Sequence, residues 1–308
     1  MADRRAIGIT GATGFVARAL IKDLTAGEGP TLRLFGRRSD VLPDGHIIQP
    51  LEPNARQLSG LDTLVHTAAL TTSKPGEPLL TEINVQLAAN LMSAAIDAGV
   101  RRFVFFSSML VHGRTASAPV SPDSALAPDD AYGRSKAAAE RALNHINRDG
   151  AIQLVVIRPP MIYGPGGKGS FNALYKLVGM GIPLPFGAAH AERSFCSVRN
   201  VVSATRRALE LPAPPPVILP ADPENFSTRS LIEAMAEAGG RSARLVPAPT
   251  ASMKLLLGAA GRGEMAASLF DPLVLDRSHW ADWGWTPPVT GRQAVADTVA
   301  HLRAESRS

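Results

Sequence analysis

Short apolar runs alternate with longer helical stretches through the first half of this 308-residue chain. The apolar runs have the length and composition of strands and cover residues 6–10, 31–35, 63–66, 102–107 and 152–158. Helical stretches lie between them at residues 15–26, 82–98 and 130–148. This regular alternation predicts an α/β fold, in which a parallel, doubly wound sheet carries helices on both faces.

Proline and glycine interrupt the second half of the chain. They cluster at residues 159–169, 181–187 and 212–216, and helices such as 228–238 lie among Pro-rich connections. Such clusters mark loops. We therefore expect a main domain over residues 1–163, to which 193–219 return. Residues 164–192 and 220–308 are expected to form a smaller, interleaved C-terminal lobe that faces the substrate.

The composition excludes several classes of function. The net charge is +5, but the basic residues are scattered and only 5% of residues are aromatic. We therefore expect no nucleic-acid partner, whereas an anionic small substrate fits the charge. Cys196 is the only cysteine, so neither an intrachain disulfide nor a cysteine-rich metal site can form. The apolar stretch at residues 253–260 is shorter than the roughly 20 residues that a membrane span needs, and a cytoplasmic protein without a span is expected.

A glycine-rich turn follows the first predicted strand. Residues 10–17 read TGATGFVA. Gly11 permits a tight turn, Gly14 lets the backbone approach a phosphate, and the helix that begins near Phe15 offers unpaired N–H groups. Ala17 stands at the third glycine position, where only close helix–strand packing is required. The turn predicts a dinucleotide site of the Rossmann type.

The end of the second strand indicates which dinucleotide binds. Arg37 and Arg38 follow this strand, and no acidic residue appears before Asp40. Two guanidinium groups suit a 2′-phosphate, whereas an acidic residue would accept hydrogen bonds from the ribose of NAD. We therefore expect NADP(H), with NAD(H) as the alternative if Arg37 and Arg38 stack on adenine or face solvent.

A tyrosine and a lysine lie four residues apart at the start of the third helix. Tyr132 and Lys136 therefore share one helix face, where an adjacent cation favours the phenolate. Ser107 and Ser108 end the preceding strand, at the sheet edge where open α/β folds bind ligands. A serine hydroxyl there could donate to a carbonyl or alkoxide oxygen. Together these residues predict general acid–base chemistry beside a dinucleotide.

At this point the chain resembles the extended branch of the short-chain dehydrogenase/reductase superfamily, which contains nucleotide-sugar epimerases, dehydratases and reductases. Further motifs carry the resemblance: HTAA at 66–69, NV at 84–85, FSS at 106–108, VHG at 111–113 and RPPMIYGP at 158–165. The resemblance implies that Ser108 polarises the substrate oxygen, Tyr132 transfers the proton, and Lys136 lowers the pKa of Tyr132 and holds the nicotinamide ribose. It implies a cofactor site made of Gly11, Thr13, Gly14, Phe15, Val16, Arg37, Arg38, Ala68, Ala69, Asn84, Ser107, Tyr132, Lys136, Pro159 and Ile162.

Two later segments are similar to a narrower group. Residues 164–171 read GPGGKGSF and residues 181–187 read GIPLPFG. They resemble bacterial reductases that convert UDP-linked 4-keto-6-deoxy-N-acetylhexosamine to UDP-N-acetylquinovosamine for polysaccharide synthesis, although Ser170 stands where asparagine is more usual. The substrate contacts that this resemblance implies are Met109, Lys168, Phe171 and Arg193. Arg193 would bind the diphosphate, and the alternative is a surface arginine on an edge strand.

Departures from these patterns keep other functions open. Met109 and Leu110 follow Ser108 where dehydratases carry an acidic pair, which argues against elimination. A second arginine, expected near the C-terminal Gly-Trp-x-Pro signature, has only Arg277 as a candidate, and it is not in register. The leading hypothesis is an NAD(P)-dependent reductase of a nucleotide-linked 4-keto sugar. The alternatives are a 4-epimerase with tightly bound NAD and a non-catalytic dinucleotide-binding sensor or assembly protein. The resemblance also implies a homodimer that pairs the helix bearing Tyr132.

Overall fold

The computed structural model describes residues 5–71 and 76–306. The chain forms two compact units. The first comprises Met1–Val111, Leu126–Arg158 and Thr205–Leu219, and the second comprises His112–Ala125, Pro159–Ala204 and Pro220–Ser308. These limits differ from the predicted domains, because residues 112–125, 159–163 and 193–204 belong to the second unit. The predicted division into a cofactor domain and a substrate lobe stays a prediction.

The first unit is built on one large sheet. Its strands, in spatial order, are β10 (Val217–Ile218), β7 (Gln153–Ile157), β6 (Arg102–Phe106), β5 (Thr63–His66), β1 (Ala6–Thr10), β2 (Thr31–Gly36), β4 (Ile47–Pro50) and β3 (Asp40–Val41). All neighbours are parallel except β3 with β4. The strand order reverses at β1, which pairs with β2 on one side and β5 on the other. This confirms the predicted doubly wound α/β fold.

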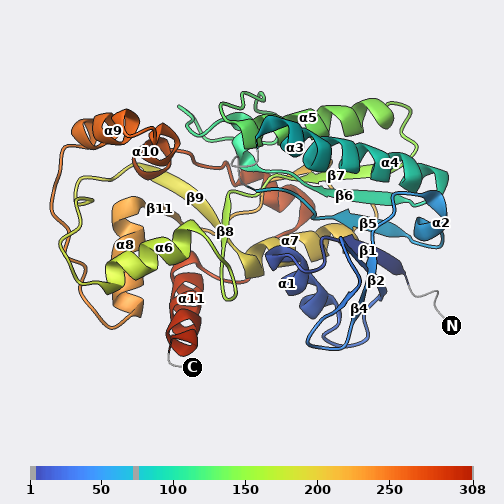
Figure 1. Ribbon diagram of the computed structural model, residues 1–308, viewed down its shortest axis with the longest axis horizontal. Helices are drawn as coiled ribbons and strands as arrows, with labels where there is room; N and C mark the ends of the chain where they lie inside the picture. The colour runs from blue at the N-terminus through green and yellow to red at the C-terminus, as the bar shows by residue number, and fades with distance from the viewer. Residues whose placement is uncertain (1–4, 72–75, 307–308) are drawn as a thin grey trace. The chain divides into compact units, whose positions relative to one another are not determined.

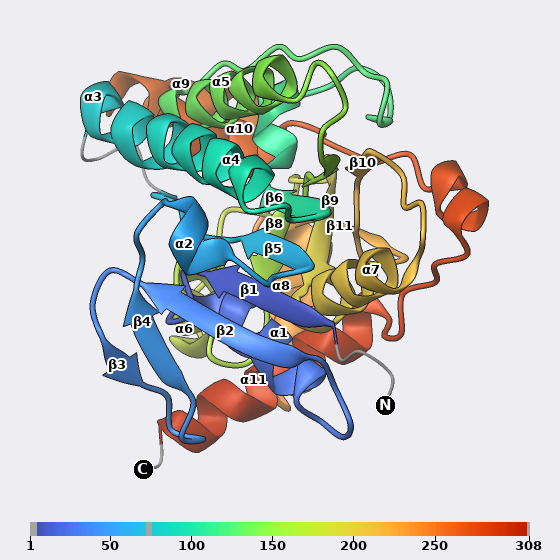
Figure 2. The same cartoon turned by 90° about the vertical axis from the view of Figure 1, so that its right-hand side faces the viewer.

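Helices cover both faces of this sheet. They are α1 (Phe15–Leu24), α2 (Ala55–Leu58), α3 (Glu77–Leu80), the π-helical turn η1 (Thr81–Gln86), α4 (Leu87–Asp97) and α5 (Ala131–Ile146). Figures 1 and 2 show α4 and α5 side by side on one face and α1 on the other. Buried apolar side chains of the strands, such as Phe35 and Phe103, pack with Leu91 of α4 and Leu143 of α5. The core of this unit therefore fixes α5 against the sheet.

One helical stretch is long and apolar. Within residues 5–71 and 76–306, only Glu77–Asp97 could cross a membrane by length and composition. Its mean hydropathy is 1.2, and 44% of the window that meets this test is buried inside the protein. A core helix of a soluble protein meets the same test, so this stretch is weak evidence for a membrane span.

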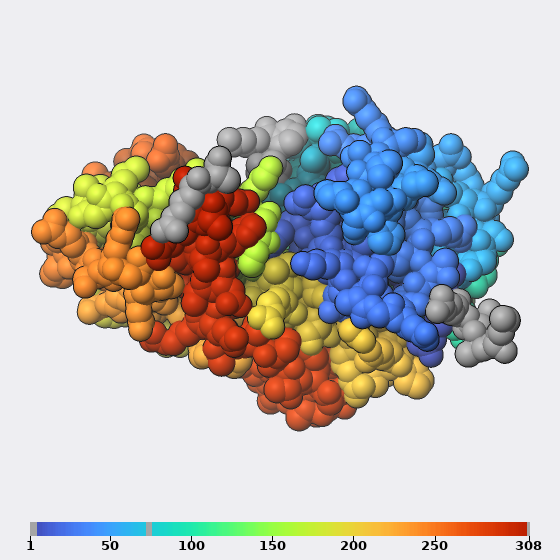
Figure 3. Space-filling model, turned by 90° about the horizontal axis from the view of Figure 1, so that it is seen from below, coloured from blue at the N-terminus to red at the C-terminus, as the bar shows by residue number. Residues whose placement is uncertain are grey.

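The second unit has a smaller sheet with helices around it. Its strands are β8 (Met161–Tyr163), β9 (Glu192–Ser197) and β11 (Asn225–Ser227), with β9 in the middle. The helices within this unit are α6 (Ser170–Gly179), α8 (Thr228–Ala238), α9 (Thr250–Ala259), α10 (Gly263–Phe270), η3 (Ser278–Trp283) and α11 (Gly291–Glu305). Two further helices, η2 (Met109–His112) and α7 (Val198–Glu210), contain residues of both units. Helix α8 has the predicted limits. Figure 3 shows the red surface of α11 against the orange surface of α8.

A buried carboxylate holds the second unit together. Asp222 is 0% exposed, and it accepts hydrogen bonds from the Tyr163 hydroxyl, the Ser197 N–H and the Asn200 side chain, each at 2.7 Å. Burial raises the pKa of Asp222, and these three donors oppose the rise. Since Tyr163 ends β8 and Ser197 ends β9, Asp222 fixes the ends of both strands.

We expect Asp222→Ala to lower the free energy of unfolding by at least about 3 kcal/mol, because it leaves three buried donors without an acceptor. Tyr163→Phe removes one donor and is expected to cost about 1 kcal/mol. Urea unfolding of both variants measures the difference. Equal losses would contradict the role of Asp222 as the shared acceptor.

Candidate functional site

The predicted acid–base residues of the first unit lie where β6 ends and α5 begins. Asp130 caps α5, since its carboxylate accepts the Gly133 N–H at 2.5 Å. A β-carbon on Gly133 would lie 2.4 Å from the Leu110 carbonyl oxygen, so only glycine permits this close approach of α5 to η2. The approach brings Tyr132 within hydrogen-bonding reach of Ser108.

Tyr132 is a protonated phenol at neutral pH. Burial raises the pKa of Tyr132 to about 12, Asp130 adds to the rise, and the hydrogen bond with Ser108 opposes it. The expected lowering of this pKa by Lys136 is therefore wrong for the protein alone. Desolvation is the largest cause of the rise, and the Lys136 ammonium is itself engaged, since it donates to the Phe106 carbonyl oxygen at 2.7 Å. A neutral phenol is suited to donate a proton.

Lys136 is buried with only 2% exposed, and its ammonium lies 4.7 Å from the centre of the Phe105 ring. Burial lowers the pKa of Lys136 to about 7, and the charge of Glu140 opposes this fall. The ring face and the Phe106 carbonyl both favour the charged form. The ammonium and the neutral amine are therefore close in free energy at neutral pH.

The sequence interpretation missed a buried carboxylate in this region. Glu140 is 2% exposed, and it accepts hydrogen bonds from the Ser107 hydroxyl and from Nε and Nη2 of Arg158, the last two at 3.1 and 2.7 Å. A signal was present, because Glu140 follows three alanines at the helical spacing of Tyr132 and Lys136. A charged residue at that spacing on an otherwise small-residue face indicates a buried partner.

The glycine turn has the backbone geometry of a phosphate cradle. Gly11 has φ +70°, and a β-carbon there would lie 2.9 Å from the backbone of Ala68. A β-carbon on Gly14 would lie 2.9 Å from the Gly11 carbonyl oxygen. Helix α1 begins at Phe15 with no side-chain cap and no acidic residue in its first turn. These residues fit the diphosphate of a dinucleotide.

Two residues of the first sheet hold this turn in place. The Thr10 hydroxyl lies 2.7 Å from Nδ1 of His66, and the Thr67 hydroxyl donates to the Thr10 carbonyl at 2.6 Å. Burial lowers the pKa of His66 to about 3, so this ring is neutral. The end of β5 therefore anchors the loop that leads into α1.

The other predicted cofactor residues of the first unit have two kinds of environment. Arg37 and Arg38 are exposed beyond the end of β2, and Asp40 is exposed with its carboxylate accepting the N–H of Val41 at 2.9 Å. Asn84, by contrast, is 1% exposed inside η1. Its amide bonds the backbone of Leu70 at 2.8 and 3.0 Å and the Ser135 hydroxyl at 2.9 Å, so it ties the loop after β5 to α5.

The predicted substrate residues lie in both units. In the first, Met109 is buried. In the second, Lys168 is exposed, whereas Phe171 is buried and stacks on Tyr163 with ring centres 4.7 Å apart. The two cofactor residues predicted in this unit are Pro159, which is buried, and Ile162, which is half-buried. Phe171 thus belongs to the core of its unit, and its predicted substrate contact stays a prediction.

Arg193 lies on the middle strand β9, so the alternative of a surface arginine on an edge strand is wrong. Its Nη1 donates to the carbonyl oxygens of Asp271 at 2.6 Å, Arg114 at 3.0 Å and Ala267 at 3.4 Å. One edge of the guanidinium therefore holds backbone of the same unit. Arg277 is engaged likewise, since its Nε donates to the Asp222 carbonyl at 3.1 Å.

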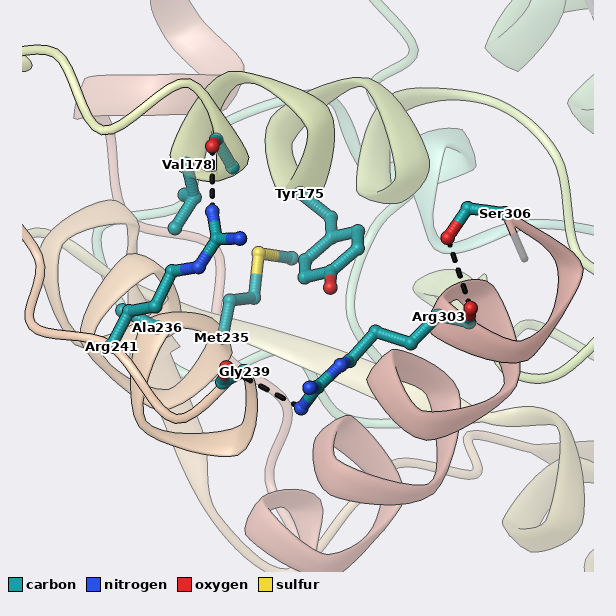
Figure 4. Close-up of a pocket in the computed structure, with 9 residues that line it drawn as sticks. Tyr175, Val178, Met235, Ala236, Gly239, Arg241, Arg303 and Ser306 are labelled. Carbon is teal, nitrogen blue, oxygen red and sulfur yellow. Dashed lines mark hydrogen bonds between the residues drawn. The ribbon is translucent and has the colours of Figure 1, made fainter.

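A pocket of about 220 Å³ lies elsewhere in the second unit (Figure 4), where α6, α8 and α11 end. Arg241 donates to the Gly179 carbonyl at 2.7 Å, and Arg303 donates to the Gly239 carbonyl at 3.4 Å. Guanidinium groups favour helix C-termini, which carry partial negative charge. These arginines therefore cap helices. The lining residues are Tyr175, Val178, Gly179, Met235, Ala236, Gly239, Arg241, Arg303 and Ser306.

We expect Gly133→Ala to lower the free energy of unfolding by about 1–3 kcal/mol, because the new methyl group would overlap the Leu110 carbonyl. The matched control is Gly258→Ala in α9, where a β-carbon meets nothing within 4 Å. There the higher helix propensity of alanine is expected to add up to about 1 kcal/mol. Urea unfolding compares the two, and a stabilised Gly133→Ala would contradict the close approach.

Comparisons with known proteins agree with this geometry. The model of the NAD dependent epimerase/dehydratase family matches residues 7–218. A UDP-glucose 4-epimerase of Vibrio cholerae is 34% identical over 98% of this chain and 97% of its own length.

Solved structures share the fold over nearly the whole chain. MoeE5 in complex with UDP-glucose and NAD has a TM-score of 0.74 and 26% identity, covering 98% of this chain and 100% of that one. The UDP-glucose 4-epimerase of Thermus thermophilus in complex with NAD has a TM-score of 0.78 at 21% identity, covering 97% and 99%. The chain therefore belongs to the NAD-dependent epimerase/dehydratase family of extended short-chain dehydrogenases/reductases, and it is an NAD(P)-dependent oxidoreductase or epimerase.

Proposed function

We propose that this protein is an NADPH-dependent reductase of the C4 ketone of a UDP-linked sugar. The observation that carries the proposal is the neutral Tyr132 phenol held beside the Ser108 hydroxyl, with buried Lys136 one helical turn away. The nucleotide-sugar substrate is supported by the UDP-glucose 4-epimerase relative and by MoeE5, which binds UDP-glucose and NAD.

The chemistry follows from the protonation states of these residues. When bound, the nicotinamide cofactor supplies a hydride to the carbonyl carbon of the sugar. Tyr132 donates its proton to the carbonyl oxygen as negative charge develops there, because its pKa of about 12 keeps it protonated at neutral pH. Ser108 hydrogen-bonds the same oxygen, and Lys136 stabilises the phenolate that remains.

The cofactor and substrate partners follow from charge. Arg37 and Arg38 support NADPH, since two guanidinium groups at the end of β2 suit a 2′-phosphate better than a ribose hydroxyl. For the diphosphate of the substrate we propose Lys168 and Arg193, whose planar guanidinium suits phosphate oxygens. A homodimer through α4 and α5 is part of the same proposal, and light scattering of the purified protein tests it.

We expect Tyr132→Phe to reduce kcat by at least about 100-fold, because the proton donor is lost while the ring is kept. NADPH binding, followed by nicotinamide fluorescence, is expected to be largely unchanged. Tyr175→Phe on α6 is the matched control and should retain full activity. Full activity of Tyr132→Phe with a UDP-linked 4-keto-6-deoxy-N-acetylhexosamine would rule out this mechanism.

We expect the double variant Arg37→Ser, Arg38→Ser to lower kcat/KM for NADPH by at least about 100-fold, since each lost charge-assisted hydrogen bond to phosphate is worth about 1.5–3 kcal/mol. The value for NADH should change little. Arg56→Ser, on α2 of the same unit, removes an exposed charge as a control. An equal loss for both cofactors would contradict a 2′-phosphate site.

A second candidate is 4-epimerisation, which the 34% identical UDP-glucose 4-epimerase favours. With NAD to accept the C4 hydride and later return it to the other face of the keto sugar, the same three residues can take the hydroxyl proton and give it back. Absorbance at 340 nm separates the candidates, because a reductase consumes one NADPH for each keto-sugar. An epimerase instead converts UDP-glucose to UDP-galactose with no net change and retains NAD through purification.

A further inference from the structure

Helix α5 carries an ionisable side chain at every fourth residue of one face: Tyr132, Lys136 and Glu140. The first two take part in the proposed chemistry. Glu140 lies one turn beyond Lys136, is 2% exposed, and faces the ends of two neighbouring strands. It receives the Ser107 hydroxyl from the end of β6 and the Arg158 guanidinium from the end of β7.

Stability alone does not account for this arrangement. The Arg158 Nη2 to Glu140 Oε2 distance is 2.7 Å, and the two side chains are 8% and 3% exposed. A buried ion pair gives little net stability over a well-packed apolar pair, because both charges lose their hydration. The same low dielectric, however, makes the field of each charge strong at its neighbours.

The groups around Lys136 show which neighbour matters. The Phe105 ring and the Phe106 carbonyl face its ammonium from β6, and His66 acts on it from β5. Tyr132 and Glu140 lie on α5 itself, and Arg158 lies beyond Glu140. Of these groups Glu140 alone is an anion, since Tyr132 and His66 are neutral at pH 7. Glu140 therefore favours the charged form of Lys136.

Glu140 also fixes Ser107, the residue that precedes Ser108. The Ser107 N–H donates to the Ile157 carbonyl at 2.8 Å, and its hydroxyl donates to Glu140. Both groups of Ser107 are thus fixed, and the next residue is Ser108. The carboxylate of Glu140 consequently holds the strand end from which Ser108 reaches Tyr132.

We propose that Glu140 is a positioning residue for this active site. Its buried negative charge favours the ammonium form of Lys136, and its hydrogen bond to Ser107 fixes the backbone that carries Ser108. Arg158 has the supporting role of pairing with the Glu140 carboxylate in the interior. The proposal rests on the proposed function, because it assumes that Lys136 and Ser108 take part in the proton transfer. The effect of Glu140 on the pKa of Lys136 can nevertheless be measured without a substrate.

The direct test is the pKa of Lys136 in the full-length protein. The chain has six lysines. Carbon NMR of protein labelled at the lysine ε-carbons follows each titration, and Lys136→Met assigns the signal. We expect a wild-type pKa of about 7. In Glu140→Gln it should fall by about one unit, because the only anion among the facing groups is lost. Arg141→Gln, an exposed neighbour on the same helix, should leave it unchanged.

A second variant separates charge from damage to the fold. Glu140→Gln leaves the Arg158 guanidinium buried without its carboxylate and is expected to be less stable. Glu140→Gln, Arg158→Met removes both charges and should recover stability. The Lys136 pKa should still lie below the wild-type value, since Glu140 is the charge that acts on it. If Glu140→Gln does not fold, the double variant alone decides.

The pH dependence of kcat/KM gives a second measurement of the positioning role. In the folded variants the decrease of kcat/KM at high pH should occur at a lower pH than in the wild type, by the same shift as the Lys136 pKa. A Lys136 pKa within about 0.3 units of wild type in Glu140→Gln, or a return to wild type in the double variant, would overturn the proposal. If the wild-type protein turns over none of the UDP-sugars, the proposed function fails, while the NMR titration still decides the role of Glu140.

Discussion

Desolvation along one face of α5 is the constraint on which the rest of the site depends. It pushes the pKa of Tyr132 up and the pKa of Lys136 down, so both side chains are disposed toward their neutral forms. A phenol that stays neutral can give a proton, but a lysine that loses its charge cannot stabilise the resulting phenolate. The surroundings of Lys136 oppose the effect of its burial with a ring face, a carbonyl oxygen and a carboxylate. The rise of the Tyr132 pKa is opposed by the hydrogen bond with Ser108.

The strands of the large sheet could be predicted because each is a short apolar run buried on both sides. Strands β1 and β5 have the predicted limits. The prolines and glycines of residues 159–169 predicted loops, yet β8 forms within them by pairing with β9, where Met161 is paired with Phe195. Such a short strand depends on its partner, which no local pattern reveals. The second helix likewise starts earlier than predicted, since the structure continues it back to Glu77.

In the site, too, the positions of residues could be predicted from local spacing, whereas their pKa shifts and contacts could not. Spacing placed Tyr132 and Lys136 on one face, and the strand end placed Ser108 beside them. The direction of the Tyr132 pKa shift could not be predicted, because it depends on burial and on the placement of Ser108 and Asp130. Residue type suggested a phosphate contact for Arg193. In the structure the Arg193 guanidinium also donates to the backbone carbonyls of Asp271 and Arg114. Residue type alone does not show whether an arginine binds phosphate or backbone.

The π-helical turn at Thr81–Gln86 sets a limit on how this family member can change. Such a turn contains one residue more than an α-helical turn of the same rise. Asn84 lies within it and bridges the loop at Leu70 to Ser135 on α5. The number of residues in this turn therefore sets which side chains of α4 face the sheet. A substitution of Asn84 would alter what this side chain bonds, whereas an insertion or deletion in the turn would rotate the helix that follows.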